Sequence, residues 1–573
     1  MNTNSLGART TRRRRFTALL CVGALALGAC GSGEDDDDEV AQEEEAPETT
    51  GEGEETTTTE AVEEGEPVQG GTITVGLESE TNSYLPGTYT GTFAGDNVAL
   101  SVFDPLMQRD AEGELKPYLA ESLEANDDLT QFTLTLREGV MFHDGTPLNA
   151  EAIKANFDDH LKIDGAATAG QLRDVDSVTV VDDLTVTYDL SQANAAFPDL
   201  LTGSVGWPFS PTASEALGED FGSQPVGTGP FKFVSYTRDS EFVLERNEDY
   251  WQEGLPYLDG ITFSPIPDEE TRLAAFESGD LNAVHSVRLS GFGTQVRALS
   301  DVEVYEGPGN SGSGAIFNVE VPPVDDPRVR RGLSLALDQK ALIDVIAGSP
   351  DAAEARNQYF SETSPFYSET VAEAWPTDDP EAAQVLLDEY VNDPERSDGK
   401  APGAPIAIEF NCTAIPSLQE QAQAYQAYWQ AVGVEVTLNA IEQSVHIQNA
   451  VTNQFMINCW RQGGDTDPYT VLFNAFGDPE TQPLNFTNYH NEQVADILDR
   501  LRTSDDQDER FDALEELGLL FAEDVPNTWT GGNNEFIATQ PEVNGVDTWT
   551  LPDGTVGDGA KNGVTIWGQV WVE

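Results

Sequence analysis

The chain has 573 residues, of which 102 are Asp or Glu and 29 are Lys or Arg, so its formal net charge is −73. This charge argues against nucleic acid and anionic lipid as binding partners, because both are polyanions. It permits cationic ligands, although a well-solvated acidic surface suited to a salty habitat is the simpler explanation. The composition is otherwise that of a globular protein, with 39% hydrophobic and 9% aromatic residues.

Residues 1–29 have the composition of an export signal. Four arginines at 12–15 precede an apolar stretch at 16–27, which is too short to span a bilayer of ~30 Å as a helix. Small residues then precede Cys30, and this order resembles the lipobox of bacterial lipoproteins. It predicts that Cys30 becomes the acylated first residue and anchors the protein to the membrane. An ordinary signal peptide with a chance cysteine is the alternative, and the arginines leave the Sec and twin-arginine routes both open.

Residues 30–66 are predicted to form an acidic, disordered tether. From residue 34 to residue 66 the chain has no lysine, arginine or aromatic residue, so it cannot bury enough apolar surface to fold. Repulsion between its acidic side chains favours an extended spacer. The ~500 residues that follow exceed the ~250 residues usual for a single core, so we expect at least two lobes.

The folded part begins with strands and continues with helices that alternate with strands. Alternating apolar residues predict strands at 71–77 and 131–137, a hairpin at 178–188, and an antiparallel pair at 231–236 and 242–246. Apolar residues spaced by three and four predict helices at 327–346, 418–432, 491–501 and 509–521. Further strands are expected at 406–412, 434–438 and 455–460. This order predicts an α/β protein with two lobes of different build.

Cys412 and Cys459 each lie near the end of an expected strand. Outside the cytoplasm two such cysteines are able to pair. A disulfide requires a Cα separation of about 4.4–6.8 Å, which the sequence does not fix. A disulfide and two separate buried thiols therefore both remain open.

Five blocks of sequence occur in an order that is typical of one family. They are GELKPYLAES at 113–122, LREGVMFHDGTPLNAE at 136–151, GTGPF at 227–231, ERNEDYW at 245–251 and DPRVR at 326–330. Together they resemble the solute-binding proteins of peptide-type ABC importers, the family 5 dipeptide- and oligopeptide-binding proteins. Within them, His143 lies in a tight turn and is expected to form structural hydrogen bonds rather than to bind a ligand.

The resemblance implies a large α/β fold of the type II periplasmic-binding-protein class. It places lobe I at 67–288 with an inserted subdomain at about 111–204, lobe II at 289–528, and a return to lobe I at 529–573. It also implies a monomeric receptor on the outer side of the cell membrane. Such a receptor needs no cofactor, closes around a solute in a cleft between its lobes, and delivers that solute to a membrane permease with its ATPase.

The binding motif of the family is altered in this chain. Peptide receptors of the family commonly carry a tryptophan and, three residues later, an aspartate that pairs with the α-ammonium group of the peptide. Here Trp460 is present, but Gly463 takes the place of the aspartate, and Asp465 substitutes only after a shift. A peptide or peptide-like solute is our first interpretation, and an oligosaccharide or another polar organic solute is the alternative. The candidate ligand-binding residues are Trp460, Arg461, Gln462, Asp465, Tyr84 and Trp529.

Two enzyme motifs occur without their required context. The G-x-G-x-x-G pattern at 307–312 precedes an expected strand, whereas a dinucleotide site needs a helix there. The S-x-x-K pattern at 397–400 has no K-T-G partner. The five histidines are scattered, so no metal site is expected. We therefore expect a receptor rather than an enzyme, with an extracytoplasmic hydrolase or chaperone-like module as the lesser alternative.

Overall fold

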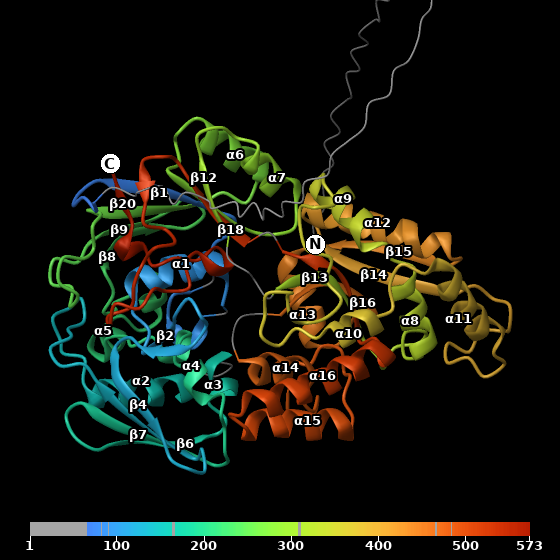
Figure 1. Cartoon of the computed structure of the whole chain (residues 1–573), viewed down its shortest axis with the longest axis horizontal. Coiled ribbons are helices and arrows are strands. Elements are labelled where there is room, and N and C mark those ends of the chain that lie inside the picture. Colours follow the sequence, from blue (N-terminus) through green and yellow to red (C-terminus); the bar gives the residue numbers. More distant parts are fainter. Residues whose placement is uncertain are drawn as a thin grey trace, which may run out of the picture. The chain divides into compact units, whose positions relative to one another are not determined.

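The computed structural model describes residues 66–81, 83–89, 91–162, 167–306, 311–463, 467–482, 484–533 and 535–573. The described residues from 66 to 573 belong to one compact unit, and Figure 1 labels many of its helices and strands. The predicted export signal, Cys30, nearly all of the predicted tether and Asp465 lie outside the described residues. In the part of the chain that is described, no helix has both the length and the apolar character needed to cross a membrane.

Lobe I is built on a seven-stranded sheet with the order β12-β18-β11-β1-β10-β9-β8. The central strand β1 runs parallel to β10 and β11, and the remaining pairs are antiparallel. The strands are β1 (Thr72–Leu77), β8 (Phe231–Thr237), β9 (Glu241–Arg246), β10 (Gly260–Pro265), β11 (Ala283–Val287), β12 (Glu303–Glu306) and β18 (Glu535–Thr539). The helices of this lobe are α1 (Phe93–Val102), α5 (Pro211–Leu217), α6 (Glu269–Glu277) and α7 (Gly291–Arg297). The short strands β19 (Val543–Asn544) and β20 (Trp571–Val572) pair with each other.

The subdomain inserted in lobe I has a sheet of its own with the order β4-β5-β7-β6. Its elements are β4 (Ala120–Ala125), β5 (Gln131–Leu136), β6 (Val175–Val180), β7 (Thr185–Leu190), α2 (Ala150–Lys162), α3 (Ala167–Gln171) and α4 (Phe197–Leu200). The hairpin of β2 (Met107–Arg109) and β3 (Leu115–Pro117) precedes this sheet. Period-two alternation places Phe132, Leu134 and Leu136 of β5 in a separate apolar core.

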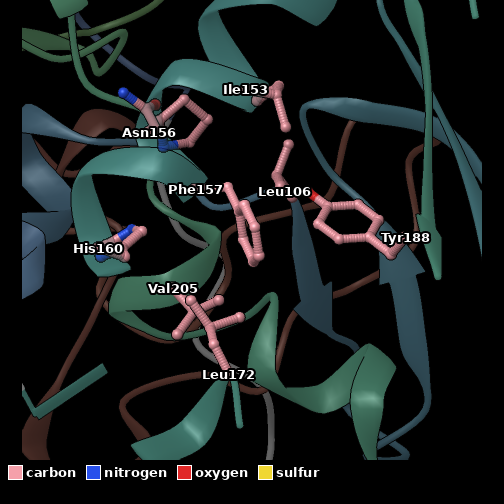
Figure 2. Close-up of a pocket in the computed structure, with 9 residues that line it drawn as sticks. Leu106, Ile153, Asn156, Phe157, His160, Leu172, Tyr188 and Val205 are labelled. Atoms are coloured by element: carbon pink, nitrogen blue, oxygen red, sulfur yellow. The ribbon is translucent and has the colours of Figure 1, made fainter. Parts of the chain in front are cut away.

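A small cavity lies inside this subdomain, between α2 and the sheet (Figure 2). Its walls include Ile153, Phe157, His160 and Tyr188, and its volume is about 20 Å³. A space of this size holds about one water molecule. The cavity is therefore too small to be the solute site.

Lobe II is built on a five-stranded sheet with the order β15-β14-β16-β13-β17. The strands are β13 (Gly312–Phe317), β14 (Ala407–Thr413), β15 (Glu435–Ile441), β16 (Ile457–Gln462) and β17 (Asn527–Gly532). The helices are α8 (Pro327–Leu335), α9 (Gln339–Ala347), α10 (Glu369–Ala374), α11 (Pro380–Asn392), α12 (Pro416–Ala431), α13 (Gln443–Val451), α14 (Pro468–Phe476), α15 (Glu492–Thr503) and α16 (Gln507–Asp524). A large apolar core that includes Phe410, Tyr425 and Trp429 holds this lobe together.

One predicted helix is wrong, because the stretch expected as a single helix at 327–346 forms both α8 and α9. The side chain of Asp338 accepts a hydrogen bond of 3.0 Å from the amide of Ala341 and so starts a new helix. The expected helix at 418–432 is confirmed as α12. It ends before Gly433, whose φ of 83° favours glycine.

The chain passes between the two sheets twice, from β12 to β13 and from β17 to β18. Because β12 belongs to the sheet of lobe I, the first crossing follows residue 306 rather than residue 288. The second crossing follows residue 532 rather than residue 528 for the corresponding reason. The helix α7 and the strand β12, which the sequence assigned to lobe II, thus extend lobe I.

Side chains connect the two crossings directly. Asn533 donates to the hydroxyl of Ser311 at 2.7 Å and accepts from the hydroxyl of Ser313 at 2.7 Å. The hydroxyl of Ser311 also donates to Glu535, the first residue of β18. The described residues of the crossings therefore form one hydrogen-bonded group at the junction of the lobes.

Candidate functional site

Three of the predicted site residues, Trp460, Arg461 and Gln462, are the last three residues of β16. In the antiparallel register, Gln462 lies opposite Gly312 and Arg461 lies opposite Ser313. The carboxyl end of β16 is thus beside the point where the chain enters lobe II. The fold brings this part of the altered family motif to the junction between the lobes.

Trp460 is half-buried on lobe II, where neighbouring rings fix its orientation. Its ring stacks on His446 with a centroid distance of 5.6 Å. It also makes a T-shaped contact with Phe486, with ring centroids 5.1 Å apart. The Nε2 atom of His446 lies 3.1 Å from the carbonyl oxygen of Cys459. Burial lowers the pKa of His446, so this ring is neutral at neutral pH. Trp460 therefore presents a preoriented aromatic surface that solvent still reaches.

Arg461 extends from lobe II to lobe I. Its guanidinium carbon lies 5.0 Å from the ring centroid of Phe93, the first residue of α1. Solvent reaches the side chain, yet the surrounding protein lowers the pKa of the guanidinium by desolvation, while the charges of Glu535 and Glu78 oppose that shift. The group stays protonated at neutral pH, because arginine titrates far above this range. A cation in partly desolvated surroundings thus lies between the lobes.

Carboxylates of lobe I lie close enough to Arg461 for their charges to affect it. Glu78, just after β1, forms an ion pair of 3.4 Å with Arg288. Burial opposes the ionisation of Glu78, but the charge of Arg288 and other nearby cations hold its pKa below the usual value. Asp96 of α1 accepts a hydrogen bond of 2.5 Å from the hydroxyl of Tyr89. Burial raises the pKa of Asp96 to about 7, so this carboxyl is partly neutral at neutral pH.

The other predicted site residues are buried or lie outside the described residues. Gln462 is 8% exposed and accepts a hydrogen bond of 2.5 Å from the hydroxyl of Tyr359. Trp529 is 1% exposed in the core of lobe II, and Tyr84 is 4% exposed in the core of lobe I. Tyr84 and Trp529 are therefore core residues of their lobes. Asp465 is among the residues that are not described.

Sequence reasoning did not identify the lobe I residues that surround Arg461, above all Phe93, Asp96 and Glu78. Glu78 follows the carboxyl end of a predicted strand, and this position was an available signal, because side chains at such sheet edges face ligands in α/β folds. Phe93 and Asp96 lie in the first turn of a short helix whose residues carry no motif. Only the fold brings these residues near Arg461.

A second set of contacts joins the inserted subdomain to lobe II. Arg173 donates to the hydroxyl of Tyr469 at 2.9 Å, and its guanidinium carbon lies 3.6 Å from the ring centroid of Phe473. Both aromatic residues belong to α14. The amide of Ala195 donates to the carbonyl oxygen of Arg502 at 2.8 Å. The lobes therefore touch here as well as at the crossings.

Asp467 connects the start of α14 to two other parts of the structure. One oxygen of its carboxylate caps α14 by accepting from the amide of Tyr469 at 2.8 Å, and the other accepts from Arg510. The backbone amide of Asp467 donates to the carboxylate of Asp199, which lies in the inserted subdomain. Asp467, which precedes α14 of lobe II, thus contacts the inserted subdomain of lobe I.

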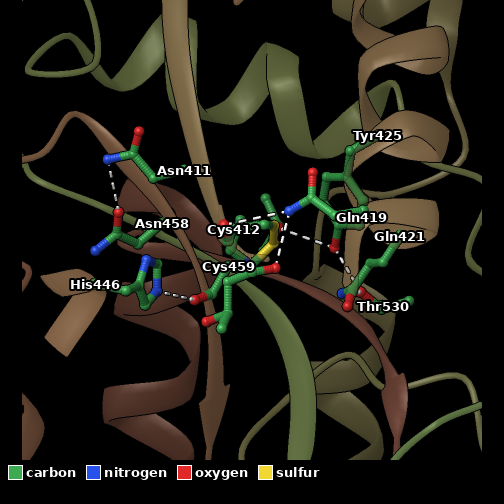
Figure 3. The surroundings of a disulfide bond; sticks show 12 residues. Asn411, Cys412, Gln419, Gln421, Tyr425, His446, Asn458, Cys459 and Thr530 are labelled. Atoms are coloured by element: carbon green, nitrogen blue, oxygen red, sulfur yellow. Dashed lines mark hydrogen bonds between the residues drawn. A yellow bond between two sulfur atoms is a disulfide. The ribbon is translucent and has the colours of Figure 1, made fainter. Parts of the chain in front are cut away.

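Cys412 and Cys459 form a disulfide, with Cα atoms 5.0 Å apart (Figure 3). The sequence left open a disulfide or two separate buried thiols, and the structure shows the disulfide. It joins β14 to β16 one residue before Trp460. Gln419 of α12 donates to the carbonyl oxygen of Thr413 at 2.9 Å and supports the same edge of the sheet. The strand that carries Trp460 and Arg461 is therefore covalently fixed to its neighbour.

Comparison with known proteins identifies relatives along most of the chain. The profile of the bacterial extracellular solute-binding proteins, family 5 Middle, matches residues 114–483. The glutathione-binding protein GsiB of Salmonella typhimurium is 28% identical over 476 residues, which are 80% of this chain and 88% of that protein.

Solved structures show the same fold. The oligopeptide-binding protein AppA from Bacillus subtilis, in complex with a nonapeptide, has a TM-score of 0.75 and 22% identity, and the match covers 89% of this chain and 100% of that one. AgaA from A. tumefacien R10, in complex with agropinic acid, has a TM-score of 0.75 and 23% identity, with coverage of 88% and 99%. The predicted α/β fold of the periplasmic-binding-protein type is confirmed.

Proposed function

The chain belongs to family 5 of the bacterial extracellular solute-binding proteins, and we propose that it is the receptor of an ABC importer for a peptide or peptide-like solute. The observation that carries the proposal is the family match over residues 114–483 in a chain whose two lobes are joined by two crossings. In this proposal the solute binds between the lobes, beside the carboxyl end of β16. The protein acts as a receptor rather than as an enzyme.

The mechanism is a rotation of the lobes about the crossings. A solute held by both lobes favours the closed state by as much as its contacts are better in that state than in the open one. Trp460 supplies an aromatic surface on lobe II, and Arg461 reaches Phe93 on lobe I. Closure gives the solute-bound receptor a surface that the open, empty form lacks. The membrane permease recognises this surface.

The relatives support peptide-like solutes as a class. GsiB is named for binding glutathione, and AppA is seen with a nonapeptide. AgaA holds agropinic acid on the same fold, and this observation favours another polar organic solute as the second candidate. The absence of an aspartate at Gly463 also favours a solute whose free ammonium group is not the main point of recognition.

We propose that Cys30 is acylated and that residues 30–66 hold the receptor away from the outer face of the cell membrane, as a monomer. Metabolic labelling with an alkyne fatty acid tests the anchor. The expected result is label on the wild-type chain and none on Cys30→Ala, with the variant released from the membrane fraction. Label retained on Cys30→Ala rejects this site of attachment.

Native mass spectrometry of the full chain, purified gently from its own host, tests the solute class. A peptide or modified peptide as the retained mass supports the proposal. A sugar or a non-peptide metabolite supports the second candidate and rejects the first. Catalytic turnover of the retained compound by the purified protein rejects the receptor proposal.

A further inference from the structure

Arg461 differs from the other arginines of the described residues. Each of those donates a hydrogen bond or forms an ion pair, as Arg288 does with Glu78 and Arg297 with Glu306. The guanidinium of Arg461 has neither with any described residue, and its contact is the ring of Phe93. Acidic residues outnumber basic ones 102 to 29, so an exposed arginine meets a carboxylate by default. The unpaired state of Arg461 is therefore a specific property of its position.

The neighbouring carboxylates are committed to other partners. Glu78 pairs with Arg288 at 3.4 Å, Asp96 accepts from Tyr89 at 2.5 Å, and Glu535 accepts from Ser311. These acids act on Arg461 through their charge but are not within hydrogen-bonding distance of it. The five N–H donors of the guanidinium thus remain free of described protein acceptors.

The chemistry of this position favours one type of ligand group. Desolvation of a cation costs free energy that a paired anion offsets. The guanidinium carbon of Arg461 lies over the ring of Phe93, and this contact uses no N–H donor, so the N–H edge stays free of described acceptors. That edge matches a carboxylate, which accepts two parallel hydrogen bonds in the same plane. Arg461 also lies where lobe II meets lobe I, so a ligand group bound there contacts the junction that closure tightens.

We propose that Arg461 binds a carboxylate of the transported solute, so that this receptor selects carboxylate-bearing solutes over their neutral counterparts. The inference rests on the proposed function, because it assumes a solute site between the lobes. It assigns the recognition of the negative charge of the solute to an arginine of lobe II. It names the substrate class by its anionic group, whether or not the rest of the solute is a peptide.

The inference is tested by comparing how the wild type and its variants bind acids and the matching neutral amides. The probes are Ala-Ala, Ala-Ala-Ala, glutathione and glutarate, each beside the derivative in which every carboxyl is a primary amide, together with uncharged maltose. Thermal shift at millimolar probe selects the pairs, and calorimetry gives their dissociation constants for wild type, Arg461→Gln, Arg461→Lys and Arg297→Gln. Arg297→Gln is the matched control, because it removes the same charge from a surface ion pair of lobe I.

The expected result is that at least one acid binds the wild type roughly 10- to 100-fold more tightly than its amide, as for hydrogen bonds to a charged group. Arg461→Gln binds the acid as weakly as the amide, Arg461→Lys is intermediate, and Arg297→Gln matches wild type. Equal binding of acid and amide by wild type overturns the inference. So does an acid preference that survives in Arg461→Gln, or a panel in which no acid binds.

The outcomes separate the two proposals. If glutarate binds in an Arg461-dependent way and no peptide binds, the carboxylate site stands and the peptide proposal falls. If a peptide and its amide bind equally well, the peptide proposal stands and the carboxylate site falls.

Discussion

The contact between Arg173 and α14 is expected to hold the inserted subdomain against lobe II, so removing it should favour the open state. The guanidinium of Arg173 donates to Tyr469 at 2.9 Å and lies 3.6 Å from the ring centroid of Phe473. A hydrogen bond of this kind contributes about 0.5–1.5 kcal/mol. A cation–π contact at a partly exposed site contributes about 0.5–1 kcal/mol. The side chain of Arg173 is 34% exposed. We therefore expect the hydrogen bond and the cation–π contact together to contribute less than the sum of their upper values.

Arg173→Ala should therefore shift the equilibrium between closed and open states by about 1–2 kcal/mol, which is a factor of about 5–30. The dissociation constant of a solute that requires the closed state rises by up to the same factor. Small-angle X-ray scattering measures the radius of gyration of the solute-free chain, and calorimetry measures the affinity. Both should change in the direction of opening.

Two further variants separate the hydrogen bond of Arg173 from its cation–π contact, and a third variant is the control. Tyr469→Phe removes the hydrogen-bonding hydroxyl and keeps the ring, whereas Phe473→Leu removes the aromatic face. Each should produce about half of the effect of Arg173→Ala. Lys154→Ala breaks an exposed ion pair with Asp158 in α2 of the same subdomain and should change neither measurement. Unchanged scattering and affinity in Arg173→Ala would refute the role of this contact in closure.

Three further predictions concern single residues. Trp460→Ala should weaken solute binding by about 1–3 kcal/mol without unfolding the chain, and unchanged calorimetric affinity would remove Trp460 from the site. Burial raises the pKa of Asp96 to about 7 from 3.8, so its contribution to stability is present below pH ~4 and is lost as the pH rises to about 7. Asp96→Asn should therefore lose less stability than wild type between pH 4 and 7 in melting experiments, and identical pH profiles would contradict this. Trp429→Ala should lower the stability of lobe II by about 3–5 kcal/mol in urea unfolding, because its fully buried ring leaves a cavity, whereas Trp429→Phe should lose much less.

Sequence patterns predicted the elements well where the pattern is local. Strands such as β1 and β5 follow from period-two alternation, and α12 follows from its aromatic stripe and from Gly433. The break between α8 and α9 was missed, because apolar spacing continues across it while Asp338 starts a new helix. Local patterns thus predict which segments are helical better than where one helix ends and the next begins.

The geometry of the candidate site was predictable only in part. Trp460 and Arg461 were selected from the altered family motif, and the strand that carries them ends at the junction of the lobes. Tyr84 was selected because it follows the first predicted strand, and Trp529 because it lies near the expected return to lobe I. The direction of a side chain depends on tertiary packing, however, and both residues face a core. The partner of Arg461 on lobe I, Phe93, is far from it in the sequence, so no local pattern indicates their contact.

The covalent link between Cys412 and Cys459 decides how the protein should be made for any of these measurements. Cytosolic thiol–disulfide systems keep cysteines reduced, whereas compartments outside the cytoplasm allow them to oxidise. A preparation from a reducing cytoplasm would carry two thiols in the strands that support Trp460. Affinities from such material describe a different covalent species. Recombinant batches should be secreted, and intact mass under non-reducing conditions should identify the oxidised form before any titration begins.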